Sequence, residues 1–553
     1  MTAPRTFSYF IARQKIWRPL APLLAAILIA PAATRATDLQ VISQWERFEL
    51  KLKSRVRYTN AIQQAELDAI FVSPLGETNR VPGFWDGGKT WRIRFAPNTP
   101  GRWVYFTSCS DTANKGLDLQ SGEFLCTAAT GNTRFGEHGP VRVARDQRSL
   151  EHADRTPFLW LGDAAWNAPC RAGLKDLEFY AGERVKQKFN VVQWKLTPTA
   201  QKKPKTAFTG RTVINVDLEY WQELDAKVDL LNRAGLLNAI APLWEIGTGA
   251  DDALPEDQAI ALLRYAVARW GANDVAWIVA FEADRSGRPA ARWQRIGRAV
   301  FGRIIHAPVI LMPNETYWVL DEFRNEAWVD AFGFTTAQAT NEDSLQWLLT
   351  GPLTLERRKL PARPLLALWP PAENVTGAAT GSSLNADQVR HLLWWSLLVT
   401  TPAGVSYRAD DVANWNAQTE KLPKGKTTLP AWQQALSLPG ANSIAPLNDA
   451  FNSIPFGRLL PFSRAVVNQP GLQSPLRYIA AEGTEARDLT VLYVPEARSV
   501  EVALGAIPRT PTTTWFNPRT GQTRPAIGTV GPTVCQFATP EAGDWLLMLK
   551  AGK

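Results

Sequence analysis

Cysteine, histidine and methionine are scarce in this chain of 553 residues, which contains four Cys, four His and three Met. The histidines do not pair at metal-ligand spacing and no CxxC pair occurs. A metal site built from soft ligands is therefore not expected, while a hard-cation site made of carboxylates stays possible. The sequence also lacks a glycine-rich phosphate-binding loop and an HExxH motif. It shows no Ser, His and Asp in the order of a known catalytic triad. We expect no cofactor and no protein-bound metal.

Long apolar runs are also missing, since none reaches the ~20 residues that span a bilayer. The run at 20–33 follows basic residues and precedes small residues that allow cleavage after Ala32 or Ala36. This order is typical of a signal peptide, so residues 1–36 are interpreted as a leader. The mature chain is then expected to be secreted or periplasmic, with no membrane span. An uncleaved anchor is the alternative.

The excess of positive charge is small once the leader is set aside. The formal net charge is +9, and the leader holds five basic residues and no acid, so cleavage after Ala36 leaves +4. No basic run is interleaved with aromatic residues in a binding pattern. A nucleic-acid partner is therefore not expected.

Two of the four cysteines, Cys109 and Cys126, flank a polar loop inside the first domain. In an oxidising compartment this spacing fits a disulfide bridge. Such a bridge would stabilise the domain by about 3 kcal/mol. Cys170 and Cys535 are expected to remain free.

Tryptophan, in contrast, is abundant, with 23 residues, several times its usual share. An indole ring is flat and apolar, which suits the C–H faces of sugar rings. Large barrels also bury many tryptophans, so burial in the core is the alternative for any single one. The surplus is a first indication of carbohydrate binding.

Changes in hydrophobic period divide the chain into three segments. Residues 38–128 show short alternating runs separated by turn signals, which predicts an N-terminal β-sandwich. Residues 470–551 return to this period of two and predict a small C-terminal β-sandwich. Between them, at 132–460, strand-like apolar runs alternate with amphipathic helix-like runs, which indicates βα units and a parallel sheet.

Eight strand-like runs in the middle segment predict a (β/α)8 TIM barrel. The helix expected after the second strand shows the alternation, because Asp217 can cap it and Gly235 can end it. The predicted strands are 158–161, 190–196, 237–244, 275–281, 308–312, 329–334, 364–369 and 404–407.

Acidic residues follow several of these strands, at the carboxyl end where TIM barrels form active sites. Glycosidic hydrolysis needs two carboxylates, one as acid and one as nucleophile or base. Glu282 is the strongest candidate, because the apolar run 275–281 ends at it and an apolar wall would keep its proton. An ion pair with Arg285 or Arg288 is the structural alternative. The acids on this shortlist are Asp163, Glu245, Glu282, Asp284, Glu315 and Glu373.

Three stretches of the middle segment resemble apiosidase-like glycoside hydrolases. The opening strands of that family are similar to PFLWLGDAAW at 157–166 and KFNVVQ at 188–193. Its fourth βα unit looks like YAVARWGA at 265–272 with the strand that leads to Glu282. The resemblance implies a glycosidase barrel in which Glu282 takes the position of a catalytic Asp. The flanking segments also resemble the β-sandwich fused ahead of such barrels and their collagen-binding-like β-domain.

The seventh strand departs from the family pattern, which has a Glu at the strand end, then Pro, and a second Glu a few residues later. Trp369 stands at the first Glu position, and only Glu373 remains of the pair. Glu282 and Glu373 are therefore the expected catalytic residues, unless the missing Glu makes the site inactive.

Further residues around the expected mouth are candidates for holding the sugar. Trp166, and Tyr407 with Trp415, could stack on a sugar ring, with burial in the core as the alternative. The full predicted substrate-binding set is Asp163, Trp166, Glu245, Asp284, Trp369, Tyr407 and Trp415.

Three functions remain open at this point. The first is hydrolysis of a plant or microbial polysaccharide by two carboxylates, with that polysaccharide or an oligosaccharide as the partner. The second is glycan binding by a catalytically inactive relative, and the third is adhesion to a protein matrix. The residues do not indicate the sugar, the linkage, retention or inversion, or the oligomeric state.

Overall fold

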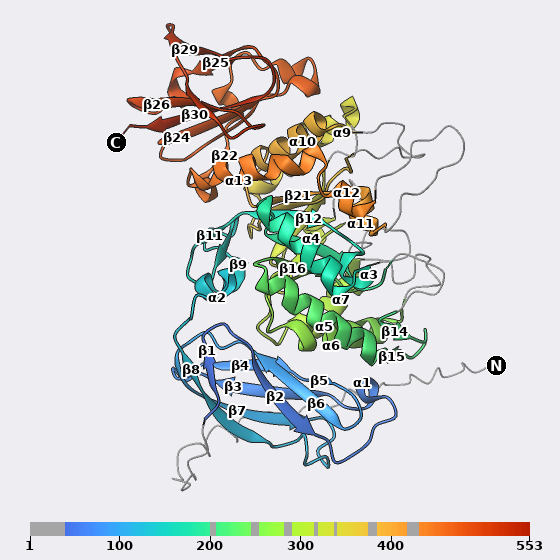
Figure 1. The fold of residues 1–553 in the computed structure, drawn as a ribbon. Coiled ribbons are helices and arrows are strands. Elements are labelled where there is room, and N and C mark those ends of the chain that lie inside the picture. Colours follow the sequence, from blue (N-terminus) through green and yellow to red (C-terminus); the bar gives the residue numbers. More distant parts are fainter. Residues whose placement is uncertain are drawn as a thin grey trace, which may run out of the picture. The chain divides into compact units, whose positions relative to one another are not determined.

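The computed structural model describes residues 39–198, 206–244, 254–280, 290–313, 319–336, 340–373, 384–416 and 431–552. In these ranges the chain forms an N-terminal β-rich domain, a central barrel and a C-terminal β-rich domain (Figure 1). This order confirms the predicted multidomain architecture. No helix in the described ranges is long and apolar enough to cross a membrane.

The N-terminal domain consists of two β-sheets. Its strands are β1 (Val41–Ser43), β2 (Phe48–Lys53), β3 (Leu67–Val72), β4 (Thr78–Pro82), β5 (Phe84–Trp85), β6 (Thr90–Phe95), β7 (Gly101–Cys109) and β8 (Ser121–Thr127). One sheet has the order β1-β8-β7-β3-β4 and the other β2-β6-β5. Along β3 buried residues alternate with partly exposed ones, as the period of two predicts. Aromatic rings fill the core, and those of Phe48 and Phe124 stack at 4.2 Å.

The predicted bridge between Cys109 and Cys126 is wrong, because both thiols are free. Strands β7 and β8 pair antiparallel, and Cys126 lies opposite Gly101, at the far end of β7 from Cys109. Eight residues of extended strand separate these two ends, a distance of about 26 Å. A disulfide needs Cα atoms less than about 7 Å apart. The spacing in sequence did not reveal that the two cysteines sit at opposite ends of a long hairpin.

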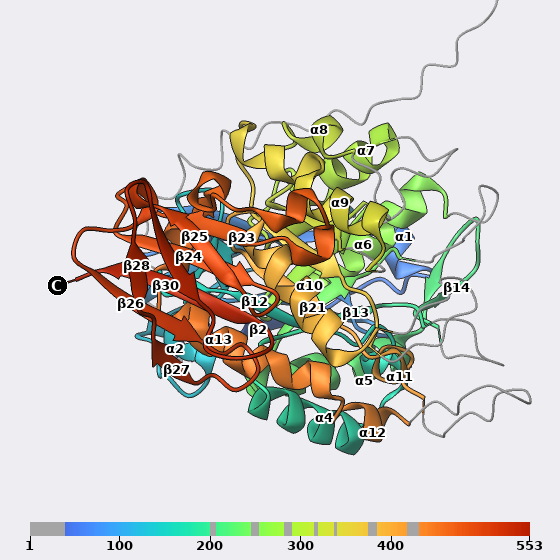
Figure 2. The same cartoon turned by 90° about the horizontal axis from the view of Figure 1, so that it is seen from above.

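Eight parallel strands close the central barrel in chain order, which confirms the predicted barrel. Figure 2 shows the fold from above, with strands β12, β13 and β21 labelled. The first strand begins two residues later than predicted and ends at Ala164, so Asp163 lies inside it. The strands are β12 (Trp160–Ala164), β13 (Val191–Lys195), β16 (Leu237–Ala241), β17 (Val275–Val279), β18 (Val309–Leu311), β19 (Ala331–Thr335), β20 (Leu365–Trp369) and β21 (Gly404–Tyr407).

Amphipathic helices cover the barrel, and α5 (Leu218–Arg233) shows how the sequence sets their limits. The Asp217 side chain accepts a hydrogen bond from the Tyr220 amide and caps the helix, as predicted. Gly235, with φ of +81°, follows the helix in the left-handed region that glycine adopts without strain. The other helices include α3 (Ala168–Arg171), α4 (Leu174–Lys186), α6 (Glu256–Trp270), α7 (Ala290–Phe301), α9 (Glu342–Thr350), α10 (Ala386–Leu398) and α13 (Ile444–Asn452).

The C-terminal domain also consists of two β-sheets, and it packs on α10. Its strands are β22 (Leu460–Pro461), β23 (Ala480–Gly483), β24 (Leu489–Val494), β25 (Ser499–Ala503), β26 (Pro511–Phe516), β27 (Thr523–Pro525), β28 (Gly528–Val530), β29 (Val534–Ala538) and β30 (Trp545–Ala551). The sheet orders are β22-β23-β24-β30-β26-β27 and β25-β29-β28. Arg390 on α10 donates to both oxygens of Asp544 at 2.8 Å, and the rings of Trp394 and Tyr493 stack at 5.5 Å. The barrel and this domain therefore share a core.

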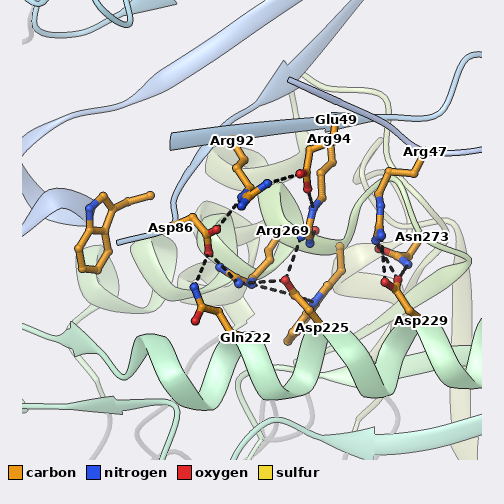
Figure 3. Close-up of polar contacts among 12 residues, drawn as sticks. Arg47, Glu49, Asp86, Arg92, Arg94, Gln222, Asp225, Asp229, Arg269 and Asn273 are labelled. Atoms are coloured by element: carbon orange, nitrogen blue, oxygen red, sulfur yellow. Dashed lines mark hydrogen bonds and ion pairs between the residues drawn. The ribbon is translucent and has the colours of Figure 1, made fainter. Parts of the chain in front are cut away.

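Ion pairs with little solvent exposure join the N-terminal domain to helices α5 and α6 (Figure 3). Asp225 on α5 accepts from Arg94 on β6 at 2.9 Å and from Arg269 on α6 at 2.8 Å. Asp86, which follows β5, accepts from Arg269 at 3.0 Å and from Arg92 at 2.5 Å. Each acid thus faces two guanidinium groups, and Arg269 bridges both acids.

Candidate active site

The lumen of the barrel is filled by side chains below its mouth. The Ser406 hydroxyl on β21 donates to Gln193 on β13, and the Gln193 amide donates to the Leu368 carbonyl at 2.9 Å. A Cβ on Gly162 would lie 2.5 Å from the Ser406 hydroxyl oxygen, so the close packing here requires glycine. The mouth, at the carboxyl ends of the strands, is therefore the place where a ligand can bind.

Three tryptophans meet at this mouth. Trp166 follows β12, Trp244 follows β16 and Trp369 ends β20. Their ring centroids are 4.3 Å apart for Trp166 and Trp244, 5.0 Å for Trp244 and Trp369, and 5.3 Å for Trp166 and Trp369. The indole N–H of Trp166 has no hydrogen-bond partner in the described part of the chain. We refer to these three residues as the tryptophan cluster.

Two cationic side chains lie over the tryptophan cluster. The Lys195 ammonium, at the end of β13, is 5.2 Å from the Trp244 ring centroid, and the Arg408 guanidinium, just after β21, is 5.0 Å from that of Trp369. A cation over an indole face is attracted by the ring quadrupole. Trp166, Trp244 and Lys195 are 5%, 6% and 3% exposed, so in the described part of the chain Trp369 and Arg408 are the members of this group that are partly exposed.

Asp163 does not reach the mouth, contrary to the prediction. Its side chain points from β12 toward α4, where one carboxylate oxygen accepts from the Tyr180 hydroxyl and from Arg184, each at 2.7 Å. All three side chains are fully buried. Burial, together with the Asp163 charge, raises the pKa of the Tyr180 hydroxyl well above its usual value. Asp163 is thus a structural partner between strand and helix.

The eight barrel strands contribute no carboxylate to the lumen. Asp163 is the only acid within them, and it faces outward. Catalytic carboxylates must therefore come from the segments that follow the strands.

Glu373 also differs from its predicted role, because it is 2% exposed and both of its oxygens are engaged in the interior. The Gly440 amide donates to both oxygens at 2.9 Å, and the Tyr407 hydroxyl donates to one at 2.6 Å. The Tyr407 ring packs in the layer between the strands and the helices. Glu373 therefore ties the segment after β20 to the 3-10 helix Pro439–Ser443.

Tyr407 and Trp415, predicted to stack on sugar, are core residues. Tyr407 is fully buried, and burial beside Glu373 raises its pKa well above the usual value. Trp415 is 6% exposed and stacks on Trp432, with ring centroids 4.1 Å apart. The core interpretation holds for both rings.

The acidic candidates Glu245, Glu282, Asp284 and Glu315 lie outside the described residues. The described chain comes within two residues of Glu282, at Ala280. Ala280 is buried and has φ of +61°, which is uncommon for a residue with a side chain and is frequent at functional sites.

Three residues at the mouth escaped the sequence analysis, namely Lys195, Trp244 and Arg408. Each stands at or just after the end of a barrel strand, which is the position used to select candidates. Lys195 also interrupts an apolar strand run with a charge. The position at a strand end therefore marks these residues in the sequence just as it marks the candidate acids.

Comparisons with known proteins agree with this architecture. Residues 144–458 match a family model described as "Apiosidase-like, catalytic domain". Residues 41–110 match a domain of unknown function, DUF5060, and residues 461–550 match a "Putative collagen-binding domain of a collagenase". A search among curated proteins gives no match.

Solved structures share the fold at low sequence identity. A "putative glycoside hydrolase" from Bacteroides vulgatus ATCC 8482 is 16% identical, with a TM-score of 0.69, over 92% of this chain and 99% of that chain. A glycoside hydrolase family 5 protein from the same organism is 18% identical, with a TM-score of 0.64, over 76% of this chain and 94% of that chain. These likenesses support the fold. Since the catalytic-domain model spans more than half of the 553 residues, the chain belongs to the apiosidase-like family of glycoside hydrolases.

Proposed function

We propose that this chain hydrolyses a glycosidic bond in a plant or microbial polysaccharide. The observation that carries the proposal is the match of residues 144–458 to an apiosidase-like catalytic domain, in a part of the chain that forms a closed eight-stranded barrel. In such barrels the reacting groups stand at the carboxyl ends of the strands, where the tryptophan cluster lies.

Glu282 is the proposed general acid and base. Strand β17 is apolar and buried throughout, and the positive φ of Ala280 turns the backbone just before Glu282. A carboxyl group beside apolar side chains keeps its proton to higher pH, which an acid catalyst requires. Such a group protonates the leaving oxygen and can then deprotonate the attacking water.

The second carboxylate is proposed to be Glu245 or Glu315. Glu373 and Asp163 are set aside, because buried hydrogen bonds hold both of them outside the lumen. Glu245 directly follows Trp244 of the tryptophan cluster, and Glu315 follows the fifth barrel strand in the sequence. The second carboxylate acts as nucleophile in a retaining enzyme and as base in an inverting one.

The tryptophan cluster is proposed to form the floor of the sugar site. Indole faces pack on the C–H faces of sugar rings, and Trp369 is the partly exposed ring of the three. Arg408, which pairs with Asp410, would supply a donor from the same surface.

Carboxyl-to-amide variants test the proposal on pectic and other plant glycans, with release of reducing sugar as the readout. We expect Glu282→Gln to lower kcat by ~10²–10⁴ on substrates with poor leaving groups, with binding retained. One of Glu245→Gln and Glu315→Gln should abolish turnover. Glu373→Gln is the matched control and should keep kcat in the folded protein. Wild-type kcat in Glu282→Gln would overturn the assignment.

A glycan-binding protein without catalysis is the second candidate, and Trp369 favours it. Trp369 stands where the resemblance implies a catalytic Glu, and its ring packs on the other two tryptophans of the cluster. In this case the wild type should bind one of the pectic or other plant glycans and release no sugar from it. Trp369→Glu should then create activity.

Export is part of the proposal, because the substrate is a polysaccharide outside the cell. The N-terminal pattern predicts a mature chain that begins near Asp38. Amino-terminal sequencing of exported protein checks this, and retention of Met1 on membrane-bound protein would contradict it.

A further inference from the structure

A cavity of about 320 Å³ lies between the N-terminal domain and the amino-terminal end of the barrel. Its walls come from β4, the end of β6, the segment around β9 (Val141–Val143), and the turns that precede β17 and β18. Because these turns stand at the amino ends of barrel strands, the cavity is at the other end of the strands from the tryptophan cluster. We refer to it as the junction cavity.

Two polar side chains that line the junction cavity make no hydrogen bond to another side chain in the described part of the chain. Asn79 on β4 is 7% exposed, and its amide makes no hydrogen bond. Asp274, just before β17, receives no hydrogen bond from another side chain, and burial raises its pKa to about 7. The Asn79 amide and the Asp274 carboxyl group therefore keep hydrogen-bonding capacity that a ligand in the cavity can use.

An aromatic ring and aliphatic side chains form much of the remaining wall. The backbone of Trp45 has φ of +68°, and its amide donates to the Pro97 carbonyl at 2.8 Å. A Cβ on Gly139 would lie 2.7 Å from the Trp45 indole, so the ring is closely packed beside the cavity. Ile305 lines the same cavity and is 72% exposed. These groups give the cavity apolar surface next to its polar groups.

The guanidinium groups that line the junction cavity are each paired with a carboxylate of the protein. They therefore offer little free positive charge to a phosphate or sulfate group. The pairs are Arg80 with Asp68 at 2.6 Å, Arg94 with Asp225 at 2.9 Å, and Arg142 with Glu151 at 2.9 Å.

Ion pairs hold the two sides of the junction cavity together. Arg47 donates to Asp229 at 2.8 Å, and Asn273, which lines the cavity, donates to the same carboxylate at 2.8 Å (Figure 3). A cavity whose walls are fixed in this way is already formed before a ligand binds, which reduces the entropic cost of binding.

We propose that the junction cavity is a second, non-catalytic site that binds a neutral sugar of one or two rings. Trp45 and the aliphatic walls suit the C–H faces of the sugar, while Asn79 and Asp274 accept from or donate to its hydroxyls. The volume lies at the lower end of the range of roughly 300–1,000 Å³ for small-molecule sites. Such a site would keep a polysaccharide chain on the protein while the barrel mouth acts on another part of it.

Calorimetric titration of the full chain carrying Glu282→Gln tests the proposal, because this background avoids consumption of the sugar. The probes are cellobiose and xylobiose, with digalacturonic acid as the charged comparison. Ala272→Trp fills the cavity and Asn79→Ala removes one polar partner, and circular dichroism shows whether each variant folds. Glu485→Gln, in an exposed turn of the C-terminal domain, is the control.

At least one neutral disaccharide should bind, and its affinity should fall by about tenfold or more in Ala272→Trp and in Asn79→Ala. Glu485→Gln should not change it, and neither cavity variant should change kcat when Glu282 is present. Absence of disaccharide binding, or binding that is equal in folded Asn79→Ala, would overturn the proposal. If the wild type releases no sugar but disaccharide binding depends on Asn79, the glycosidase proposal fails and the junction site stands.

Discussion

Arg94 of the N-terminal domain donates to Asp225 of helix α5 at 2.9 Å, across the boundary between the sandwich and the barrel. The same carboxylate accepts from Arg269 on α6, and the two arginine side chains are 7% and 1% exposed. Two nearly buried guanidinium groups from different domains therefore share one acid, while Arg94 also pairs with Glu49 and Arg269 with Asp86. The sandwich and the barrel should accordingly unfold as one cooperative unit.

Asp225→Asn should lower the free energy of unfolding by about 1.5–3 kcal/mol, because it removes one of the two carboxylate partners of both Arg94 and Arg269. Urea denaturation followed by tryptophan fluorescence measures this loss. Glu123→Gln is the matched control, since Glu123 pairs with Arg102, whose side chain is 61% exposed. Glu123→Gln should lower the free energy of unfolding by less than about 1 kcal/mol. Equal losses in the two variants would contradict the coupling between domains.

Glu373→Gln should affect stability rather than chemistry. The Gln side chain has one acceptor oxygen where Glu373 has two. The Gly440 amide and the Tyr407 hydroxyl must then share that oxygen. We expect a loss of about 1–3 kcal/mol in the free energy of unfolding. Thermal denaturation measures it, and activity assayed well below the melting temperature should stay within a few-fold of wild type. A wild-type melting temperature together with abolished turnover would show that Glu373 is a catalytic residue.

The folded protein should lose stability between pH 6.5 and pH 4 through His152 on β10 (Leu150–His152). Burial lowers the pKa of this histidine to about 4, and its Nδ1 is 2.7 Å from the Gly139 carbonyl oxygen. Between these pH values the unfolded chain binds a proton that the folded chain does not, so the free energy of unfolding falls as pH falls. The full effect is about 3 kcal/mol.

Urea denaturation at several pH values from 7 to 4 gives the slope for wild type and for His152→Gln. The variant should lose the part of the slope that His152 contributes. His138→Gln serves as the control. The His138 side chain is 29% exposed. An unchanged slope in folded His152→Gln would show that the histidine does not couple to folding.

Removal of the C-terminal domain should make the barrel insoluble. Trp394 on α10 stacks on Tyr493 at 5.5 Å, and residues of β24 and β30 belong to the same core cluster as the barrel helices. A chain that ends at residue 459 exposes this apolar surface, which favours aggregation. Size-exclusion chromatography of the truncated and full chains measures the outcome. A monomeric truncated chain with wild-type melting behaviour would show that the domain is an independent module.

The local pattern of the sequence determined the architecture of this protein. The change from a period of two to alternating strands and helices marks the sandwich and the barrel, since each period reflects how side chains alternate along one element. Asp217 and Gly235 mark one helix by interactions within a few residues, so their roles can be read without the fold. Glu282 follows a buried strand for the same local reason.

Only the tertiary structure decided which way each polar side chain points and what it binds. The first strand extends three residues past its predicted end, so Asp163 lies inside the strand, on the face beside Arg184, and does not follow it at the mouth. Glu373 is held by Gly440, 67 positions further along the chain. The sequence spacing of Cys109 and Cys126 says nothing of the strand length between them. Such contacts depend on how distant segments pack, and no local spacing encodes that packing.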